Sequence, residues 1–194
     1  MSAIHEHVLQ NGMTLLCWPQ RHLHGLEFGL YLKGGPLYET EETQGISNLL
    51  EHLCFRGLGG LNREGLLREL NRFGTNLDAA TYAEGLVFRL KCLPRFFDAA
   101  LEYFLRFFAN VAWTPEQIAA EKQVVLRQLE ADGDGDLFDR AACDFRKTEN
   151  GAFPPLGTPE SLMALTEADI QLWQEMIFQP QNACLVMTGN FSDG

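Results

Sequence analysis

The first part of the sequence consists of short apolar runs separated by turn-forming residues. Residues 4–18 contain two apolar runs on either side of Asn11-Gly12, a dipeptide typical of the two-residue turn of a β-hairpin. A third run, over residues 25–35, ends in a pair of glycines where the chain can turn sharply. Three strands are therefore predicted in this part of the chain.

Two helical patterns follow. We expect one helix from about residue 43 to residue 55, with Gly57 placed to end it, and a second from Asn62 through residue 72. Asn62 is a good N-cap because its side chain can accept a hydrogen bond from a backbone N–H of the first turn. Gly74, at the C-terminal side, suits the left-handed conformation in which many helices end.

Two strands and a phenylalanine-rich helix are predicted next. Apolar runs over residues 76–80 and 85–93 indicate the strands. Residues 95–113 contain apolar side chains at helical spacing, which favours a wide stripe facing the core over a membrane-surface or ligand-stacking role. The stripe consists of Phe97, Leu101, Phe104, Leu105 and Phe108.

The second half of the chain is mainly helical in pattern. Thr114, followed by proline, is a good N-cap for a long helix that reaches residue 130 and ends at the sequence ADGDGD. More helix is expected over residues 137–147 and again from Thr166, which forms a capping-box pattern with Asp169. A last apolar strand is predicted over residues 183–189.

Strands and helices are thus mixed without the regular alternation of a doubly wound sheet. We therefore predict the α+β class, with helices packed on one face of a mostly antiparallel sheet. The 194 residues fit a single domain that is long enough to bury a core.

Composition and charge narrow the possible partners. The formal net charge of −11 argues against nucleic acid or an anionic membrane as a partner. No run approaches the ~20 apolar residues of a membrane-spanning helix, and no N-terminal apolar segment follows a basic one. The five cysteines are scattered without a CxxC pair, which predicts reduced thiols, no thiolate metal site and a cytoplasmic location.

The stretch GISNLLEHLCFRG, residues 45–57, contains the candidate chemistry. On a helix, the pattern H-x-x-E-H presents two histidines toward one metal ion, with the glutamate beside the bound water as general base. Here Asn48 stands at the first histidine position and is followed by Glu51 and His52. A glutamate–histidine pair alone is more often solvated or structural than catalytic, so the surrounding sequence has to decide.

That surrounding sequence resembles peptidase family M16, which includes pitrilysin, insulinase and the mitochondrial processing peptidases. The stretch is similar to the family pattern G-[IL]-x-H-x-x-E-H-x-x-F-[KR]-G, with its glycines, Phe55 and Arg56 in register. The similarity runs from the first hairpin to Phe191 and includes FGTNLDAATYAEGLVFRL, TPEQIAAEKQVVLRQLE and ACLVMTGNF. The chain is therefore identified as a member of this family, with the M16/LuxS-like metallopeptidase fold.

The resemblance implies a third zinc ligand on a downstream helix, at the second of two acidic positions that lie seven residues apart. These positions are Glu121 and Gln128 in this chain. His52 is thus the residual metal ligand, and Asn48 and Gln128 are degenerate ligand positions. Glu51 becomes a vestigial general base. Because amide oxygens are poor zinc ligands beside imidazole or carboxylate, we expect no bound cofactor and no activity of the chain alone.

The resemblance also implies an assembly and a substrate. Members of the family close two or four such domains like a clamshell around an unfolded peptide, so residues 1–194 correspond to one half of a two-domain unit. The edge-strand region that contacts substrate corresponds to Asn76, Asp78, Ala79 and Thr81, with Asp78 where asparagine is usual. We predict peptide binding, or pairing with an active M16-type half in a homo- or hetero-oligomer.

Two alternatives stay open on the sequence. Because Glu51, His52 and Glu121 are all kept, a zinc-dependent endopeptidase with atypical ligands is one of them, and zinc would then be the cofactor. The other is a purely structural subunit of a larger complex.

Overall fold

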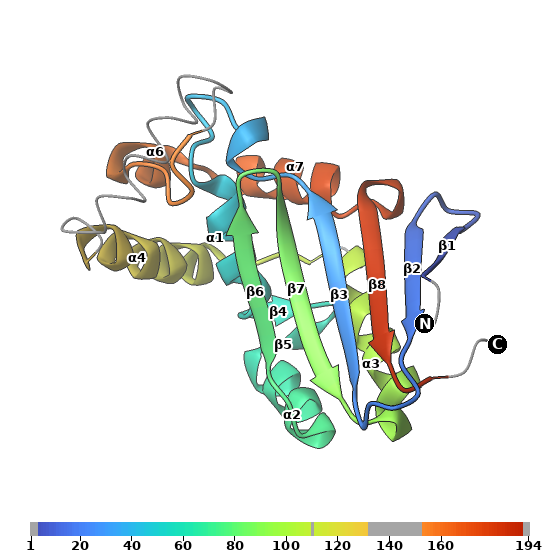
Figure 1. Ribbon diagram of the computed structural model, residues 1–194. Coiled ribbons are helices and arrows are strands. Elements are labelled where there is room, and N and C mark those ends of the chain that lie inside the picture. The colour runs from blue at the N-terminus through green and yellow to red at the C-terminus, as the bar shows by residue number, and fades with distance from the viewer. Residues whose placement is uncertain (1–3, 110, 132–152, 192–194) are drawn as a thin grey trace.

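The computed structural model describes residues 4–109, 111–131 and 153–191. Its centre is a six-stranded sheet with the strand order β1-β2-β8-β3-β7-β6 (Figure 1). Neighbouring strands run antiparallel except β2 and β8, which are parallel. The strands are β1 His5–Val8, β2 Thr14–Pro19, β3 Leu26–Lys33, β6 Leu77–Tyr82, β7 Gly85–Cys92 and β8 Ala183–Gly189.

Helices α1, α3 and α7 lie behind the sheet in Figure 1, whereas α4 and α6 extend past its β6 edge. A two-stranded ribbon of β4 Gly57–Leu58 and β5 Leu61–Asn62 follows α1. The predicted α+β class, with helices on one face of a mostly antiparallel sheet, is confirmed. The helices are α1 Ile46–Cys54, α2 Arg63–Phe73, α3 Phe97–Leu105, α4 Pro115–Ala131, α6 Pro159–Ala164 and α7 Glu167–Ile177.

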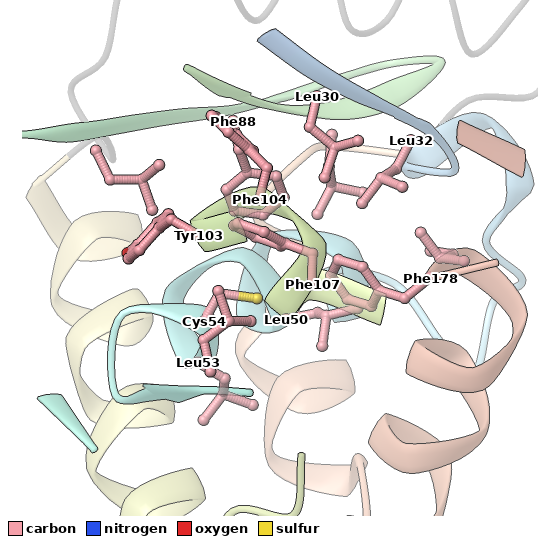
Figure 2. Close-up of a cluster of buried hydrophobic side chains, with 14 of the residues drawn as sticks. Leu30, Leu32, Leu50, Leu53, Cys54, Phe88, Tyr103, Phe104, Phe107 and Phe178 are labelled. Atoms are coloured by element: carbon pink, nitrogen blue, oxygen red, sulfur yellow. The ribbon is translucent and has the colours of Figure 1, made fainter. Parts of the chain in front are cut away.

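The core lies between the sheet and α1, α3 and α7, and aromatic rings fill much of it (Figure 2). The ring centroids of Phe88 on β7 and Phe107 are 4.4 Å apart, and Phe107 also stacks on Phe104 at 5.9 Å. The sheet side of the core includes Phe28, Leu30 and Leu32 of β3, which are buried. They point the same way because alternate residues of a strand share one face. These contacts fix the sheet against α3.

The predicted stripe on the phenylalanine-rich helix is confirmed at four of its five positions, because Phe104 is buried and Phe97, Leu101 and Phe108 pack against the core. Tyr103, Phe104 and Phe107 are buried, whereas Leu105 is 50% exposed. The α-helix ends at Leu105 and continues as a 3₁₀ turn over Arg106–Phe108. The prediction therefore differs at Leu105, which points away from the core, and at Tyr103 and Phe107, which the stripe left out. Phe107 reaches the core because a 3₁₀ turn has about three residues per turn, so the buried positions shift after Leu105.

Several helix caps match the prediction. Asn62 Oδ1 accepts from the backbone N–H of Gly65 at 2.9 Å, and Gly74 ends α2 in the left-handed conformation. Thr166 and Asp169 form the predicted capping box of α7. Helix α4 begins after Thr114, whose Oγ1 accepts from the backbone N–H of Gln117.

Other boundaries differ from the prediction. The first hairpin has a five-residue loop over residues 9–13 instead of a two-residue turn, because the last strand pair is Val8 with Thr14. Helix α1 begins at Ile46, three residues later than expected, and Gly57 belongs to β4. Helix α6 was not predicted, and the helix expected over 137–147 lies outside the described residues. No helix in the described ranges is long and apolar enough to cross a membrane.

Candidate functional site

Helix α1 carries the motif and contacts β6, α4 and α7. Its first turn is held by Glu39, which accepts hydrogen bonds from the backbone N–H groups of Gly45 at 2.8 Å and Ser47 at 3.0 Å. Gly45 takes φ +83° at the N-cap, where a Cβ would lie 2.6 Å from the carbonyl oxygen of Leu156. The carboxylate thus replaces a local cap and fixes the angle at which α1 enters the core.

His52, Glu121 and Arg56 meet where α1 faces α4. His52 Nδ1 lies 3.3 Å from Glu121 Oε2, where it donates a hydrogen bond when it carries the proton. Arg56 Nε donates to the other carboxylate oxygen of Glu121. Side-chain exposure is 19% for His52, 28% for Arg56 and 6% for Glu121. Both oxygens of a buried carboxylate are therefore bound by nitrogen groups of α1 and the turn after it.

These contacts decide the ionisation of Glu121. Burial alone would raise its pKa, but the hydrogen bonds from His52 and Arg56 and the positive charge of Arg56 outweigh burial and lower the pKa of Glu121 below its ordinary value. The carboxylate is therefore ionised at neutral pH. Lys122, the next residue of α4, donates to the carbonyl oxygens of Leu165 at 2.5 Å and Met163 at 3.2 Å, which ties α4 to the end of α6.

Glu51 has a different environment. Its Oε2 accepts a hydrogen bond of 2.5 Å from Thr81 Oγ1 on β6, and the residue is 9% exposed. Burial raises the pKa of Glu51, and the Thr81 hydrogen bond and the His52 charge offset burial only in part. The negative charge of Asp78 on the same strand raises the pKa further. A carboxyl group in this setting takes up a proton more readily than an exposed glutamate does.

Asn48 and Gln128, the two degenerate ligand positions, have different surroundings. Asn48 is 9% exposed, and its Oδ1 has no hydrogen-bond partner among the described residues. Gln128 is exposed near the end of α4, which projects past the sheet edge (Figure 1). In the described ranges, no three histidine, cysteine, aspartate or glutamate side chains are grouped so that they could hold a metal ion.

The predicted substrate-binding residues lie at or beside the free edge of the sheet. Among the described strands, β6 pairs with β7 on one side and has no neighbour on the other. Asp78 is exposed on β6, Ala79 packs partly against the core, and Asn76 is exposed just before the strand. Thr81, the fourth of these residues, points to Glu51. The motif helix and the open strand edge therefore adjoin.

Two residues of this site had no predicted role. Arg56 was noted only as part of the family pattern and Glu39 was given no role, but Arg56 binds Glu121 and Glu39 caps α1. No local signal pointed to the role of Arg56, because Arg56 lies beyond the end of α1 and binds a residue 65 positions along the chain. Glu39 gave no local signal, since its hydrogen bonds reach six and eight residues along the chain.

Comparisons with known proteins agree with the fold and with the resemblance to peptidase family M16. The family described as "Insulinase (Peptidase family M16)" matches residues 24–142. An uncharacterized zinc protease of Rickettsia felis is 26% identical over 185 residues, which cover 94% of this chain and 45% of that protein. This chain therefore spans about half the length of that relative.

Solved structures show the same fold. A protease from Helicobacter pylori superimposes with a TM-score of 0.89 at 21% identity, covering 99% of this chain and 47% of that one. A structure described as the peptidase M16 inactive domain from Pseudomonas fluorescens gives a TM-score of 0.86 at 17% identity, with 98% and 47% covered. At such identities the likeness establishes the fold.

Proposed function

The chain belongs to peptidase family M16, and we propose that it is a non-catalytic domain of that family, which binds an extended peptide or pairs with a catalytic half. The observation that carries the proposal is the contact of Glu121 with both His52 and Arg56. Arg56 supplies a positive charge to the carboxylate from within the protein, and His52 places a ring nitrogen against its other oxygen. A reduced, cytoplasmic setting suits Cys54, Cys92 and Cys184, which form no disulfide among the described residues.

The side chains at the motif do not fit a zinc ion. Zinc sites use imidazole, thiolate and carboxylate ligands, usually in a tetrahedral arrangement. This corner of the fold offers one imidazole, the amide of Asn48 and a carboxylate that Arg56 already binds. Gln128 contributes a second amide on an exposed helix end. Without a metal-activated water, Glu51 has no acidic proton to remove, so no hydrolytic step is assigned to it.

Peptide binding is supported by the free edge of β6. A strand edge presents unpaired backbone N–H and C=O groups to which an extended peptide can add as another strand. Asp78 is exposed on this edge, and the chain is acidic overall with a net charge of −11. A basic or neutral unfolded peptide would therefore be favoured over an acidic one.

Pairing with a second domain is supported by the lengths of the similar proteins. The chain spans 45% of the Rickettsia felis relative and 47% of the Helicobacter pylori structure, so each of those proteins contains as much chain again. An interface with such a half would use a surface that lacks helices. The sheet face opposite α1, α3 and α7 fits, with Tyr31 45% and Trp18 44% exposed on it.

A zinc-dependent endopeptidase with atypical ligands is the second candidate. The buried Asn48 Oδ1 without a hydrogen-bond partner favours it, because a carbonyl oxygen in that state can accept a cation. The raised pKa of Glu51 also suits a general base.

Zinc content separates the two candidates. The protein is equilibrated with excess zinc, desalted and analysed beside an Asn48→His, Gln128→Glu double variant. We expect no retained zinc in the natural chain and about one ion per chain in the variant, because the variant restores an imidazole and a carboxylate. Stoichiometric zinc in the natural chain, with chelator-sensitive cleavage of an unstructured peptide that Glu51→Gln abolishes, would establish the endopeptidase instead.

Hydrogen–deuterium exchange with an unstructured basic peptide tests the binding mode. We expect slower exchange over residues 77–82 and no change in β1, the opposite edge of the same sheet, which serves as an internal control. Equal protection of both edges would contradict a specific peptide site at β6. A further measurement, size-exclusion chromatography with light scattering, reports whether the chain pairs with itself.

A further inference from the structure

A pocket of about 330 Å³ lies beside the His52–Glu121 contact, between α1, α2, α4 and β6, and both residues line it. Its walls are largely apolar. Three leucines of α2 line it, and Leu77 of β6 and Val124 of α4 contribute as well. Such a volume is at the lower end of small-molecule sites, which range from roughly 300 to 1,000 Å³. The leucines of α2 are Leu66, Leu67 and Leu70.

Tyr103 gives this pocket a buried polar group that nothing in the described chain satisfies. The residue is 2% exposed, and its hydroxyl has no hydrogen-bond partner among the described residues. Tyr103 lines the pocket, and Figure 2 shows its hydroxyl turned away from Phe104 and Phe107. Native proteins rarely leave a buried hydroxyl without a partner, so this one indicates a bound group with a polar atom.

Two arginines give the pocket a positive charge. Arg56 uses Nε for Glu121, and its two terminal nitrogens have no hydrogen bond in the described part of the chain. Arg63, the first residue of α2, is exposed and makes no ion pair with any described residue. Glu121 is the one carboxylate among the lining residues, so Arg56, Arg63 and Glu121 together leave the lining positive by one charge. This contrasts with the net charge of −11 for the whole chain.

We propose that this pocket binds a small carboxylate with an apolar body of about ten heavy atoms, since the volume equals that of about ten water molecules at roughly 30 Å³ each. The carboxylate lies between Arg56 and Arg63, the apolar body packs on the leucines of α2, and the Tyr103 hydroxyl completes the polar contacts. The same chemistry occurs in a free apolar acid and in the last residue of a peptide. The inference does not depend on the proposed function, because the pocket residues are the same with or without a metal.

Calorimetric titration of the full chain tests the proposal with two pairs of probes. The first pair is 4-phenylbutanoate and the neutral 4-phenylbutan-1-ol, and the second is acetyl-Ala-Phe as free acid and as amide. We expect each acid to bind about tenfold or more tightly than its neutral counterpart, because a charge-assisted hydrogen bond is lost in the latter. Binding of the phenylbutanoate alone identifies a free acid as ligand, and binding of the dipeptide acid identifies a peptide C-terminus. Equal binding of acid and neutral probes, or no binding by either acid, overturns the proposal.

Three variants locate the site. Arg63→Gln should weaken acid binding about five- to tenfold, whereas Arg68→Gln, one turn along α2 with an exposed ion pair to Glu64, should leave it unchanged. Tyr103→Phe should weaken it about three- to tenfold without loss of thermal stability, since its hydroxyl makes no hydrogen bond within the described protein. If Arg68→Gln weakens binding as much as Arg63→Gln does, or if Tyr103→Phe has full affinity, the acid binds elsewhere.

Discussion

Glu51 lies against β6 and Glu121 lies on α4, and the two carboxylates differ in almost every respect except burial. Glu121 is bound through both oxygens by Arg56 and His52, and its pKa is lowered. Among the described residues, Glu51 has a single neutral donor, Thr81, and its pKa is raised by burial. One carboxylate is neutralised within the protein and the other is left short of positive charge.

The difference shows where an external group can act. A buried charge is tolerated only when it is paired and hydrogen-bonded, a condition that Glu121 meets. Glu51 meets it only in part, so its ionised form is stabilised by any donor or cation that arrives from outside, and Glu51 adjoins the open β6 edge. Glu121 is therefore stabilised by partners within the protein, whereas the ionised form of Glu51 would gain more from a donor or cation supplied from outside.

The largest expected change in the free energy of unfolding comes from removing Arg56, which binds Glu121. Arg56→Met keeps much of the apolar stem and leaves Glu121 buried, with His52 as its one remaining partner among the described residues. Breaking a buried pair from one side costs about 3–5 kcal/mol, and the 28% exposure of Arg56 reduces this to about 2–3 kcal/mol. Urea denaturation at pH 7 measures the change in the free energy of unfolding.

Arg68→Met is the matched control for this change. Arg68 pairs with Glu64 on the surface of α2, and its loss should change the free energy of unfolding by about 0.5 kcal/mol or less. Equal effects of the two substitutions would mean that the Glu121 contact carries no special stability. Glu121 would then not differ from Glu51 in the stability that its contacts provide.

The helices show which parts of the fold the sequence could reveal. The caps at Asn62 and Thr166 were predicted because each hydrogen bond joins residues three apart, so the signal lies within one helical turn. The start of α1 was misplaced because Glu39 caps it from six and eight residues away, and Gly45 is fixed by the backbone at Leu156. Local patterns identify local contacts and miss caps that depend on the fold.

The site shows the same division. The spacing of Glu51 and His52 placed both on one helix, and resemblance pointed to Glu121 and to the strand that holds Thr81. That Arg56 would bind Glu121 could not be read from the sequence, because 65 residues separate them and α1 and α4 must first be packed together. Nor could the sequence show that Gln128, seven residues after the buried Glu121, would be exposed.

The second prediction compares the two carboxylates directly by charge-neutral substitution. Glu121→Gln should lower the free energy of unfolding at pH 7 by about 1–2 kcal/mol, since a charge-assisted hydrogen bond is lost. Glu51→Gln should raise the free energy of unfolding by about 0.5–2 kcal/mol. The substitution removes a buried charge that has little compensation, and replacing such a group often stabilises a protein. Urea denaturation of both variants and the natural chain from pH 8 to pH 3 gives the values.

The pH dependence of the two effects also differs in sign. The lowered pKa of Glu121 gives stability that is present above the unfolded pKa of about 4.3 and lost as pH falls through the folded pKa, so the Glu121→Gln deficit shrinks in acid. The raised pKa of Glu51 gives a cost that is present above the folded pKa and disappears below about pH 4, so the Glu51→Gln gain vanishes there. If Glu121→Gln and Glu51→Gln change the free energy of unfolding at pH 7 in the same direction, the contrast between Glu121 and Glu51 is wrong.

The smallest effect is expected at the hydroxyl that Glu51 uses. Thr81→Val keeps the shape of the side chain but removes the donor of the 2.5 Å hydrogen bond, so the ionised form of Glu51 loses its one direct partner among the described residues. The free energy of unfolding should fall by about 1 kcal/mol at pH 7 and by less near pH 4, where Glu51 is protonated. Thr75→Val, at an exposed hydroxyl just before β6, should show no such pH dependence. If both valine variants follow the same pH profile, Thr81 does not govern the charge of Glu51, and the Glu51 side of the site is held by groups other than β6.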